Sequence, residues 1–291
     1  MNLATMGPET GRQPRQPRLS SRVALWLARV LPRGYWRIAS WAARRDPTLW
    51  DIALPLASPP GEYIRVDMRE TVASNFLRHG LIPGQRGHEK LLRGLLRPGD
   101  LCFDIGANVG YTAILFASLV QPGGRLVALE PGDRAFRILL RNARERPAIT
   151  ARKLGASAES GAITFYESAM SDVSSIVPVE NARQITIQTI ALDALAREEG
   201  HPCFIKIDVE GHEPAVFAGM TELLRHPQPP IILFEALTDA VLAQCIAILG
   251  NSRAAFALYA VAGDGSLSPQ LDLRETADFL ALPPWATQRL G

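Results

Sequence analysis

The sequence predicts a doubly wound α/β protein, and two observations support this prediction. From residue 101 onward, short apolar runs typical of buried strands alternate with segments of helical periodicity, which is the pattern of a parallel sheet covered by helices on both faces. Two of these runs, Leu101–Ile105 and Cys203–Ile207, lead directly into acidic residues and glycine, where a helix is expected to begin. Ligands of open α/β sheets bind beyond the carboxyl ends of the strands, so we expect the functional site at these two strand ends.

The same alternation predicts the other elements of the sheet. Apolar runs predict further strands at residues 125–129, 149–154, 162–167, 184–190, 231–234, 255–261 and 279–282. Helical spacing predicts helices at residues 110–120, 134–144, 191–199, 214–225 and 241–249. A Ser-rich loop at residues 168–181 interrupts the alternation, and we expect an irregular, β-rich insertion around it.

An extension of different character precedes the sheet. Residues 1–45 hold nine arginines and one acid, Glu9, so they carry about +8 in a chain whose net charge is +2, and the rest of the chain is mildly acidic. Residues 1–21 are polar and contain three prolines, which predicts a disordered basic tail. Helical spacing follows at residues 20–45, with a break at 32–34, and again at 70–81 and 88–96, while residues 63–66 suit a strand.

The basic extension bears on partners and location. A basic arm on a mildly acidic body favours contact with an anionic membrane or protein surface over nucleic acid, and a solvated tail is an equally weighted alternative. Trp26, Trp36 and Trp41 suit a helix that lies in a membrane interface or one that caps the core, and we favour the cap. No apolar run reaches the roughly 18–20 residues of a membrane span. Three cysteines without metal-ligand spacing fit a reducing compartment, so we expect a cytoplasmic protein, with or without peripheral membrane contact.

The first glycine turn indicates which ligand the crevice holds. Its glycines, Gly106 and Gly110, do not have the G-x-G-x-x-G spacing of dinucleotide-binding turns. Asp104 stands at the strand tip, where its carboxylate would repel a pyrophosphate but attract a cationic ligand such as S-adenosylmethionine. Glu130 ends the next strand 20 residues after Gly110 and is placed to accept hydrogen bonds from both ribose hydroxyls. The structural alternative is a tight turn with an N-capping aspartate.

Together these motifs resemble the signatures of the FkbM-type S-adenosylmethionine-dependent methyltransferases. The resemblance covers about residues 88–236 and depends on residues 104–112, 129–131 and 206–213. It implies a class I, Rossmann-like, seven-stranded fold and methylation of hydroxyl groups on sugars, glycolipids or secondary metabolites. The implied cofactor contacts are Asp104, Gly106, Asn108, Gly110, Tyr111, Thr112 and Glu130. The family usually has an acid where this chain has Ala158, and this departure moves the expected adenine contact to Ser157 or a backbone amide.

The second strand end supplies candidate catalytic residues. Lys206, Asp208 and Glu210 alternate along the chain and share one face, where charges are costly unless they are paired or functional. An ion pair of Lys206 with Asp208 or Glu235 is the structural alternative. His212 is the first candidate for a general base because its ordinary pKa, about 6.5, lies near working pH. Asp208 is the second candidate, as the base or as the group that orients the hydroxyl, and Glu210 and Glu235 belong to the same cluster.

A metal site competes with this interpretation. The loop from Asp208 to Glu213 offers carboxylate and imidazole ligands for a divalent ion that would acidify the acceptor. Because all of these ligands come from one loop, we predict no metal.

We divide the chain into a basic tail (1–21), a helical extension or cap (22–87) and a methyltransferase domain (88–291). The predicted function is S-adenosylmethionine-dependent O-methylation of a small-molecule or glycan hydroxyl. A non-catalytic, S-adenosylmethionine-binding module at a membrane or protein partner is the alternative, and the carboxylate of Asp104 disfavours an NAD-linked dehydrogenase.

Overall fold

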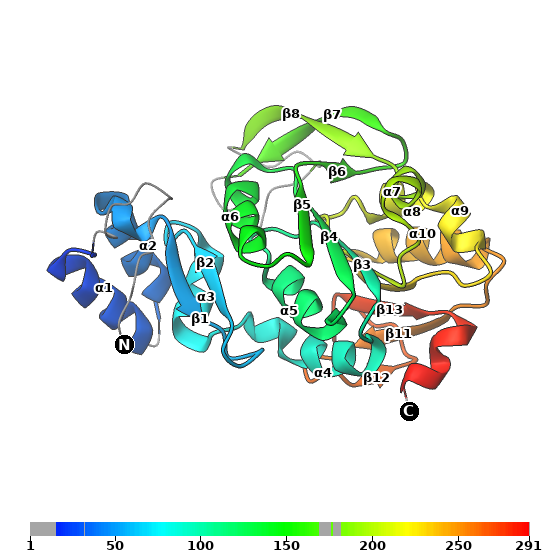
Figure 1. Ribbon diagram of the computed structural model, residues 1–291, viewed down its shortest axis with the longest axis horizontal. Coiled ribbons are helices and arrows are strands. Elements are labelled where there is room, and N and C mark those ends of the chain that lie inside the picture. Colours follow the sequence, from blue (N-terminus) through cyan, green and yellow to red (C-terminus); the bar gives the residue numbers. More distant parts are fainter. Residues whose placement is uncertain (1–15, 32, 169–175, 177–181, 291) are drawn as a thin grey trace.

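The computed structural model describes residues 16–31, 33–168, 176 and 182–290, and it is built around an eight-stranded sheet (Figure 1). The strand order is β12-β11-β13-β10-β9-β3-β4-β5. Seven strands have the predicted class I arrangement, in which β13 alone runs antiparallel to its neighbours β10 and β11, and the two-residue β12 adds an eighth strand at the edge. The bounds are β3 Leu101–Ile105, β4 Arg125–Leu129, β5 Ile149–Arg152, β9 Phe204–Ile207, β10 Ile231–Glu235, β11 Ala257–Val261, β12 Leu267–Ser268 and β13 Asp278–Leu282.

The position of the site follows from the order of the strands in the sheet. The chain runs outward from β3 to β4 and β5, and then returns to place β9 on the other side of β3. In the register of this central pair, Asp104 lies opposite Lys206 and Ile105 lies opposite Ile207. A crevice opens where the connections that follow two neighbouring parallel strands run to opposite sides of the sheet. The carboxyl ends of β3 and β9 are therefore the expected place for a ligand.

Helices cover both faces of the sheet, as the unbroken apolar strands require. Successive side chains of β3 alternate between two cores: Cys102 joins the core under α4 to α6, and Phe103 joins the core under α7 to α10. The bounds are α4 Arg86–Leu95, α5 Tyr111–Val120, α6 Asp133–Arg144, α7 Leu192–Glu199, α8 Glu213–Ala218, α9 Thr221–Arg225 and α10 Asp239–Gly250, with a final 3-10 segment at Pro284–Leu290.

The single helix predicted at residues 214–225 is wrong, because the chain forms two helices, α8 and α9, with a break at Gly219. A Cβ atom on Gly219 would lie 2.2 Å from the carbonyl oxygen of Ser157, so the backbones approach too closely for any side chain. The carboxylate of Asp193 then accepts hydrogen bonds from the N–H groups of Glu222 and Leu223, at 2.9 and 3.0 Å, and starts the second helix.

The strand predicted at residues 149–154 ends two residues early, at Arg152. The chain then contributes β6 (Gly155–Ala156) to a separate small sheet of order β6-β8-β7, which also holds β7 (Gly161–Glu167) and β8 (Arg183–Ile190) and lies across one end of the main sheet (Figure 1). Most of the Ser-rich loop at 168–181 lies outside the described residues.

The N-terminal extension forms its own layer at one end of the molecule (Figure 1). It consists of α1 Leu19–Val30, α2 Tyr35–Arg45, η1 Pro47–Leu49, β1 Ile52–Pro55, β2 Tyr63–Val66, α3 Thr71–His79 and η2 Pro83–Gln85. Its buried side chains are continuous with the core under α4 to α6, but Trp26, Trp36 and Trp41 are exposed, and the division of the chain into domains stays a prediction. Within the described residues, no helix is long and apolar enough to cross a membrane.

Two expectations for the extension are corrected. The disordered tail predicted at residues 1–21 reaches too far, because Leu19–Ser21 already form the first turn of α1, where the buried Asp46 accepts a hydrogen bond from the N–H of Arg18 at 2.9 Å. Residues 1–15 of that tail lie outside the described residues. The strand β1 was not predicted, and it forms because Ile52 and Leu54 bury their side chains while pairing with β2.

One buried side chain ties the extension to the main sheet. Asn142 of α6 is fully buried and hydrogen-bonds to both backbone groups of Arg65 in β2, accepting from the N–H at 2.8 Å and donating to the carbonyl at 3.1 Å. Its amide also donates to the carbonyl of Val109, in the glycine turn after β3, at 2.8 Å. A single amide therefore fixes the extension and the turn relative to each other.

We expect Asn142→Leu to lower the free energy of unfolding by about 3 kcal/mol, because it leaves several buried backbone groups without partners. Chemical denaturation measures the change, and Asn251→Leu at the exposed end of α10 is the control. A loss of less than about 1 kcal/mol would show that the two backbones find other partners.

Candidate active site

A pocket of about 270 Å³ lies at the switch point, beyond the carboxyl ends of β3, β4, β9 and β10. Its walls come from the glycine turn after β3, the end of β4, the loop after β9 and the small sheet. The extension closes one side through Val72 and Asn75 of α3 and through Ile82 and Gln85.

The glycine turn is held tightly against its neighbours. A Cβ atom on Gly106, whose φ is +80°, would lie 1.8 Å from the carbonyl oxygen of Asp208, so only glycine lets the two loops pass. The N–H groups of Gly106 and Ala107 both donate to the carbonyl of Leu129, at 3.0 and 2.9 Å. The N–H of Asn108 donates to Glu130 at 2.9 Å, and that of Gly110 donates to the carbonyl of Ala107 at 2.8 Å. These four donors are therefore already used and are not offered to a phosphate.

Glu130 lines the pocket and anchors the turn at the same time. Its two carboxylate oxygens each accept one backbone N–H, from Asn108 at 2.9 Å and from Gly132 at 2.7 Å. An ionised carboxylate has about four acceptor positions, so both oxygens keep one for a ligand hydroxyl. Burial raises the pKa of Glu130 to about 7, although the two backbone hydrogen bonds act in the opposite direction.

Asp104 occupies a deeper position than the sequence suggested. We expected its carboxylate at the mouth of the turn, but the residue is fully buried and does not line the pocket. Among the described residues neither of its oxygens has a hydrogen-bond partner. Burial raises the pKa of Asp104 to about 6, while the positive charge of Lys206 opposes this shift. The carboxylate of Asp104 thus adds negative potential beneath the glycine turn. Its direct contact with a cofactor stays a prediction.

Tyr111 and Thr112, at the start of α5, both line the pocket. The ring of Tyr111 packs on Phe76 of the extension, with ring centroids 5.2 Å apart, and burial raises the pKa of the tyrosine to about 12. The hydroxyl therefore stays protonated at neutral pH and is available as a hydrogen-bond donor.

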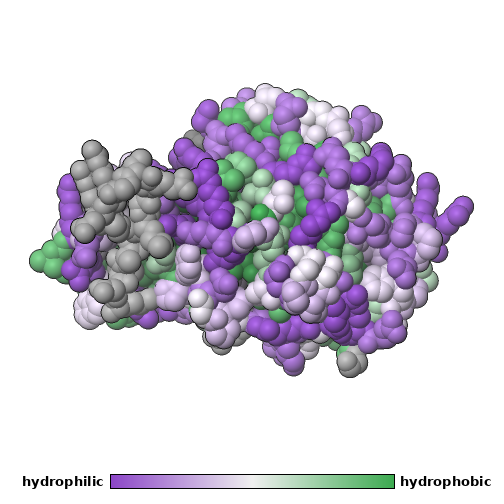
Figure 2. Space-filling view, viewed as in Figure 1, coloured by the Kyte–Doolittle hydropathy of each residue, from purple (hydrophilic) through white to green (hydrophobic). Residues whose placement is uncertain are grey.

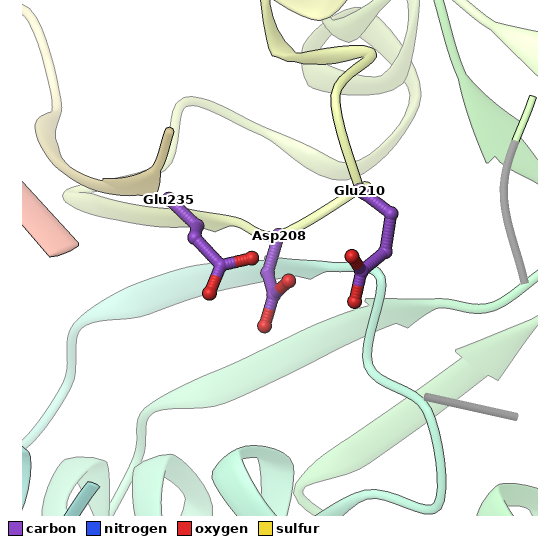
Figure 3. A group of neighbouring side chains, drawn as sticks. All are labelled: Asp208, Glu210 and Glu235. Atoms are coloured by element: carbon purple, nitrogen blue, oxygen red, sulfur yellow. The ribbon is translucent and has the colours of Figure 1, made fainter. Parts of the chain in front are cut away.

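The loop after β9 gathers the predicted catalytic acids. Oxygen atoms of Asp208, Glu210 and Glu235 lie within 4.8 Å of one another (Figure 3). The Nζ atom of the buried Lys206 lies 2.8 Å from Asp208 Oδ2, so the ion pair considered above is present. Although burial alone would lower the pKa of Lys206, the charges of Asp208 and Asp104 raise it, and the lysine stays protonated. Burial, followed by repulsion from Asp208, raises the pKa of Glu235 to about 9.

Glu213 shapes this loop without entering the pocket. One oxygen of its fully buried carboxylate accepts hydrogen bonds from the N–H groups of Val209 and Gly211, at 3.0 and 3.2 Å. The chain between them turns sharply, with a φ of +55° at Glu210 and +96° at Gly211. The sequence placed Glu213 in the loop that offers candidate metal ligands. Its hydrogen bonds show that it also presents Glu210 to the pocket.

The structure does not bring every predicted site residue into the pocket. His212 and Ser157 lie outside its lining, and the hydroxyl of Ser157 is 3.0 Å from His212 Nε2. Burial lowers the pKa of His212. This geometry gives no support to His212 as the base, while Lys206, Asp208, Glu210 and Glu235 all line the pocket.

Several residues of the pocket wall were not predicted from the sequence. Where Ser157 was expected, the pocket is lined by Leu154, Gly155 and Ala156, together with Phe165 of β7. Phe165 is a buried aromatic residue at an inward position of its strand, and this alternation is the signal that would have identified it. Asn75 and Gln85, from the extension, carried no sequence signal.

Three acidic oxygens in reach of one another also raise the question of a metal. Asp208, Glu210 and Glu235 are the one such group found among the described residues, and carboxylate oxygens suit Mg²⁺ or Mn²⁺. However, Asp208 is already paired with Lys206, and the raised pKa of Glu235 keeps that group protonated at neutral pH. The prediction of no metal therefore stays a prediction.

The strand order, with a glycine turn and an acid-lined pocket at its switch point, defines a class I, Rossmann-like methyltransferase fold. The methyltransferase FkbM domain matches residues 104–249, and the chain belongs to the FkbM methyltransferase family. The hexuronic acid methyltransferase AglP of Haloferax volcanii is 31% identical over 160 residues, which is 53% of this chain and 65% of that protein. The 31-O-demethyl-FK506 methyltransferase FkbM of Streptomyces tacrolimicus is 40% identical over 101 residues, or 34% of this chain and 38% of that protein.

The chain thus aligns with less than two thirds of the length of either relative. Among solved structures, a methyltransferase FkbM from Methylobacillus flagellatus is 14% identical, with a TM-score of 0.43 over 90% of this chain and 58% of that one. A likeness of this size adds nothing to the assignment, which depends on the family match.

We expect Glu130→Ala to raise the Kd for S-adenosylmethionine at least tenfold, because it removes charged acceptors for the ribose hydroxyls. Isothermal titration calorimetry measures this change, with the exposed Glu159→Ala as the control. The raised pKa adds a second test: wild-type affinity should fall as the pH drops below about 7 and the carboxylate is protonated. The variant should lose this pH dependence, and an unchanged Kd in a folded variant would contradict the contact.

Proposed function

We propose that the protein is an S-adenosylmethionine-dependent O-methyltransferase that methylates a hydroxyl of a sugar, glycolipid or secondary metabolite. The observation that carries this proposal is the charge of the pocket. Among the described residues that line it, Glu130, Asp208, Glu210 and Glu235 are acidic and Lys206 alone is basic. A cationic ligand suits such a pocket, whereas a pyrophosphate would meet repulsion.

The residues present fit the cofactor in two respects. The N–H groups of Gly106, Ala107, Asn108 and Gly110 already donate to Leu129, Glu130 and Ala107, so these four are not free for the pyrophosphate of a dinucleotide. The buried, unpartnered carboxylate of Asp104 adds negative potential beneath the turn, which favours an ammonium or sulfonium group nearby. These features support S-adenosylmethionine as the cofactor.

When held beside Glu130 and the glycine turn, S-adenosylmethionine would supply a sulfonium methyl group for in-line displacement by the acceptor oxygen, with a thioether as the leaving group. The chain contributes alignment, which effective-molarity data value at roughly 7–11 kcal/mol. It also contributes a base for the hydroxyl proton. Asp208, held by Lys206, orients the hydroxyl. Glu235 accepts the proton in its ionised form, which is the minor form at neutral pH but a strong base, because the pKa is raised to about 9.

The relatives support the acceptor class. One is named for a hexuronic acid and the other for 31-O-demethyl-FK506. The pocket of this chain favours a neutral hydroxyl compound over an acid, because a carboxylate on the acceptor would be repelled by Asp208 and Glu210.

We expect saturable binding of S-adenosylmethionine by calorimetry and formation of S-adenosylhomocysteine with at least one member of a panel of neutral sugars, hexuronic acids and macrocyclic alcohols. Assays in EDTA should retain the activity, since Lys206 already neutralises Asp208. Cofactor binding without turnover of any acceptor would favour a non-catalytic module. Saturable NADH binding in place of S-adenosylmethionine would overturn the proposal.

We expect Glu235→Gln to lower kcat by about 10²–10⁴-fold, the usual contribution of a general base. In the wild type, kcat/KM should rise with pH through the neutral range, because a carboxyl group with a raised pKa must lose its proton before it can accept another. The variant should lose this rise while it keeps its cofactor Kd, and the exposed Glu222→Gln should match the wild type. A pH profile that the substitution leaves unchanged would exclude Glu235 as the base.

A further inference from the structure

Helices α1 and α2 place their side chains in an unusual way. The side that packs on the core carries small residues, including Ala24 and Ala28 of α1 and Ala39 and Ala43 of α2. The outer side carries the bulky apolar residues, which are 41% to 76% exposed and are Leu19, Val23, Trp26, Val30, Trp36 and Trp41. A surface helix of a water-soluble domain usually has the opposite distribution, with polar residues outward. An apolar surface of this kind marks a site of interaction.

The exposed residues of the two helices form one surface, which we call the Trp–Arg face. On α1, Leu19, Val23, Trp26 and Val30 follow each other at intervals of four, three and four residues and so lie along one side of the helix. A groove between the helices is bordered by α1 and by Trp36 and Trp41 of α2. At this end of the molecule, hydrophobic side chains protrude beside hydrophilic ones (Figure 2).

Cationic side chains surround this apolar surface. Six exposed arginines lie in α1, α2 and the turn between them, and the segment from residue 19 to 45 contains no acid; they are Arg22, Arg29, Arg33, Arg37, Arg44 and Arg45. Two of them reach tryptophans: the guanidinium carbon of Arg45 lies 4.4 Å from the centroid of the Trp41 ring, and Arg37 lies 6.0 Å from that of Trp36. The face therefore combines apolar bulk with positive charge.

We propose that the Trp–Arg face docks the protein on a membrane surface that contains anionic phospholipids. Tryptophan is enriched at the membrane–water interface, where its ring lies among the headgroups, and each arginine near an anionic bilayer strengthens binding. The aliphatic residues Leu19, Val23 and Val30 fit acyl chains.

Other occupants fit the face less well. A second copy of the chain would bring six more arginines to the same surface, and residues 1–15 contain two arginines against one acid, so neither complements the charge. Nucleic acid would satisfy the arginines but would leave the exposed leucine and valines in water. Charge complementarity and the aliphatic residues together therefore select an anionic lipid surface.

The test uses the full chain and sedimentation with vesicles of phosphatidylcholine, with or without phosphatidylglycerol. We expect binding that requires phosphatidylglycerol, weakens with salt and shifts tryptophan emission to the blue. The double variant Trp26→Ser/Trp41→Ser and the triple variant Arg22→Gln/Arg37→Gln/Arg44→Gln should each lower the partition coefficient at least tenfold. The matched triple variant Arg183→Gln/Arg197→Gln/Arg274→Gln, at arginines that are 61% to 89% exposed elsewhere, should bind as the wild type does.

Several outcomes would overturn the proposal. Equal binding to both kinds of vesicle would show that the protein does not recognise anionic lipid. An equal loss of vesicle binding in the control variant would show that the Trp–Arg face is not the binding surface. A dimer in light scattering that the tryptophan variant abolishes would assign the face to a second copy of the chain. Binding to single-stranded RNA or DNA that the arginine variant abolishes, without vesicle binding, would assign the face to nucleic acid.

Discussion

The close approach of two backbones at the switch point is the constraint on which the site depends. The turn after β3 passes the loop after β9 so closely that a Cβ on Gly106 would lie 1.8 Å from the carbonyl oxygen of Asp208. This crossing joins the half of the sheet that holds the glycine turn to the half that holds the acids. The backbones of the glycine turn and of the loop after β9 are therefore fixed relative to each other by direct contact.

Two carboxylates then stabilise the two loops, one on each side of the crossing. Glu130 accepts hydrogen bonds from the turn after β3, and Glu213 accepts them from the loop after β9. The two acids differ in whether their carboxylate can still accept a hydrogen bond from a ligand in the pocket. Glu130 borders the pocket and has acceptor capacity left, whereas Glu213 is buried beneath the loop and serves the conformation of Glu210. A carboxylate that accepts backbone N–H groups thus supports ligand binding at the end of β4 and positions the side chain of Glu210 after β9.

The sequence predicted the class of fold because its strongest signals are local. The runs at β3 and β4 are continuous and apolar, and glycine with acids follows at the strand ends, so their bounds could be given to the residue. The errors arose where distant residues decide the local structure. The helix at 214–225 is broken because Ser157 packs against Gly219 and Asp193 caps α9, and neither contact can be seen in the helical spacing.

The same distinction applies to the site. The acids at the ends of β9 and β10 were predicted to cluster, and they do, because parallel strands end at one edge of the sheet. His212, only four residues after Asp208, was expected among them, but the turn that Glu213 organises carries it toward Ser157 instead. The depth of Asp104 was also missed, since a strand pattern shows the face of a residue but not how far the following turn covers it.

Among the described residues that line the pocket, the acids outnumber the one lysine, and this balance of charge affects turnover. With the proposed chemistry, the ligand that enters is positively charged at sulfur, and the thioether that remains after the reaction is not. The acids around Lys206 then hold the spent cofactor less firmly than the fresh one, because the attraction to the sulfonium is lost. The charge balance of the pocket thereby favours product release and exchange.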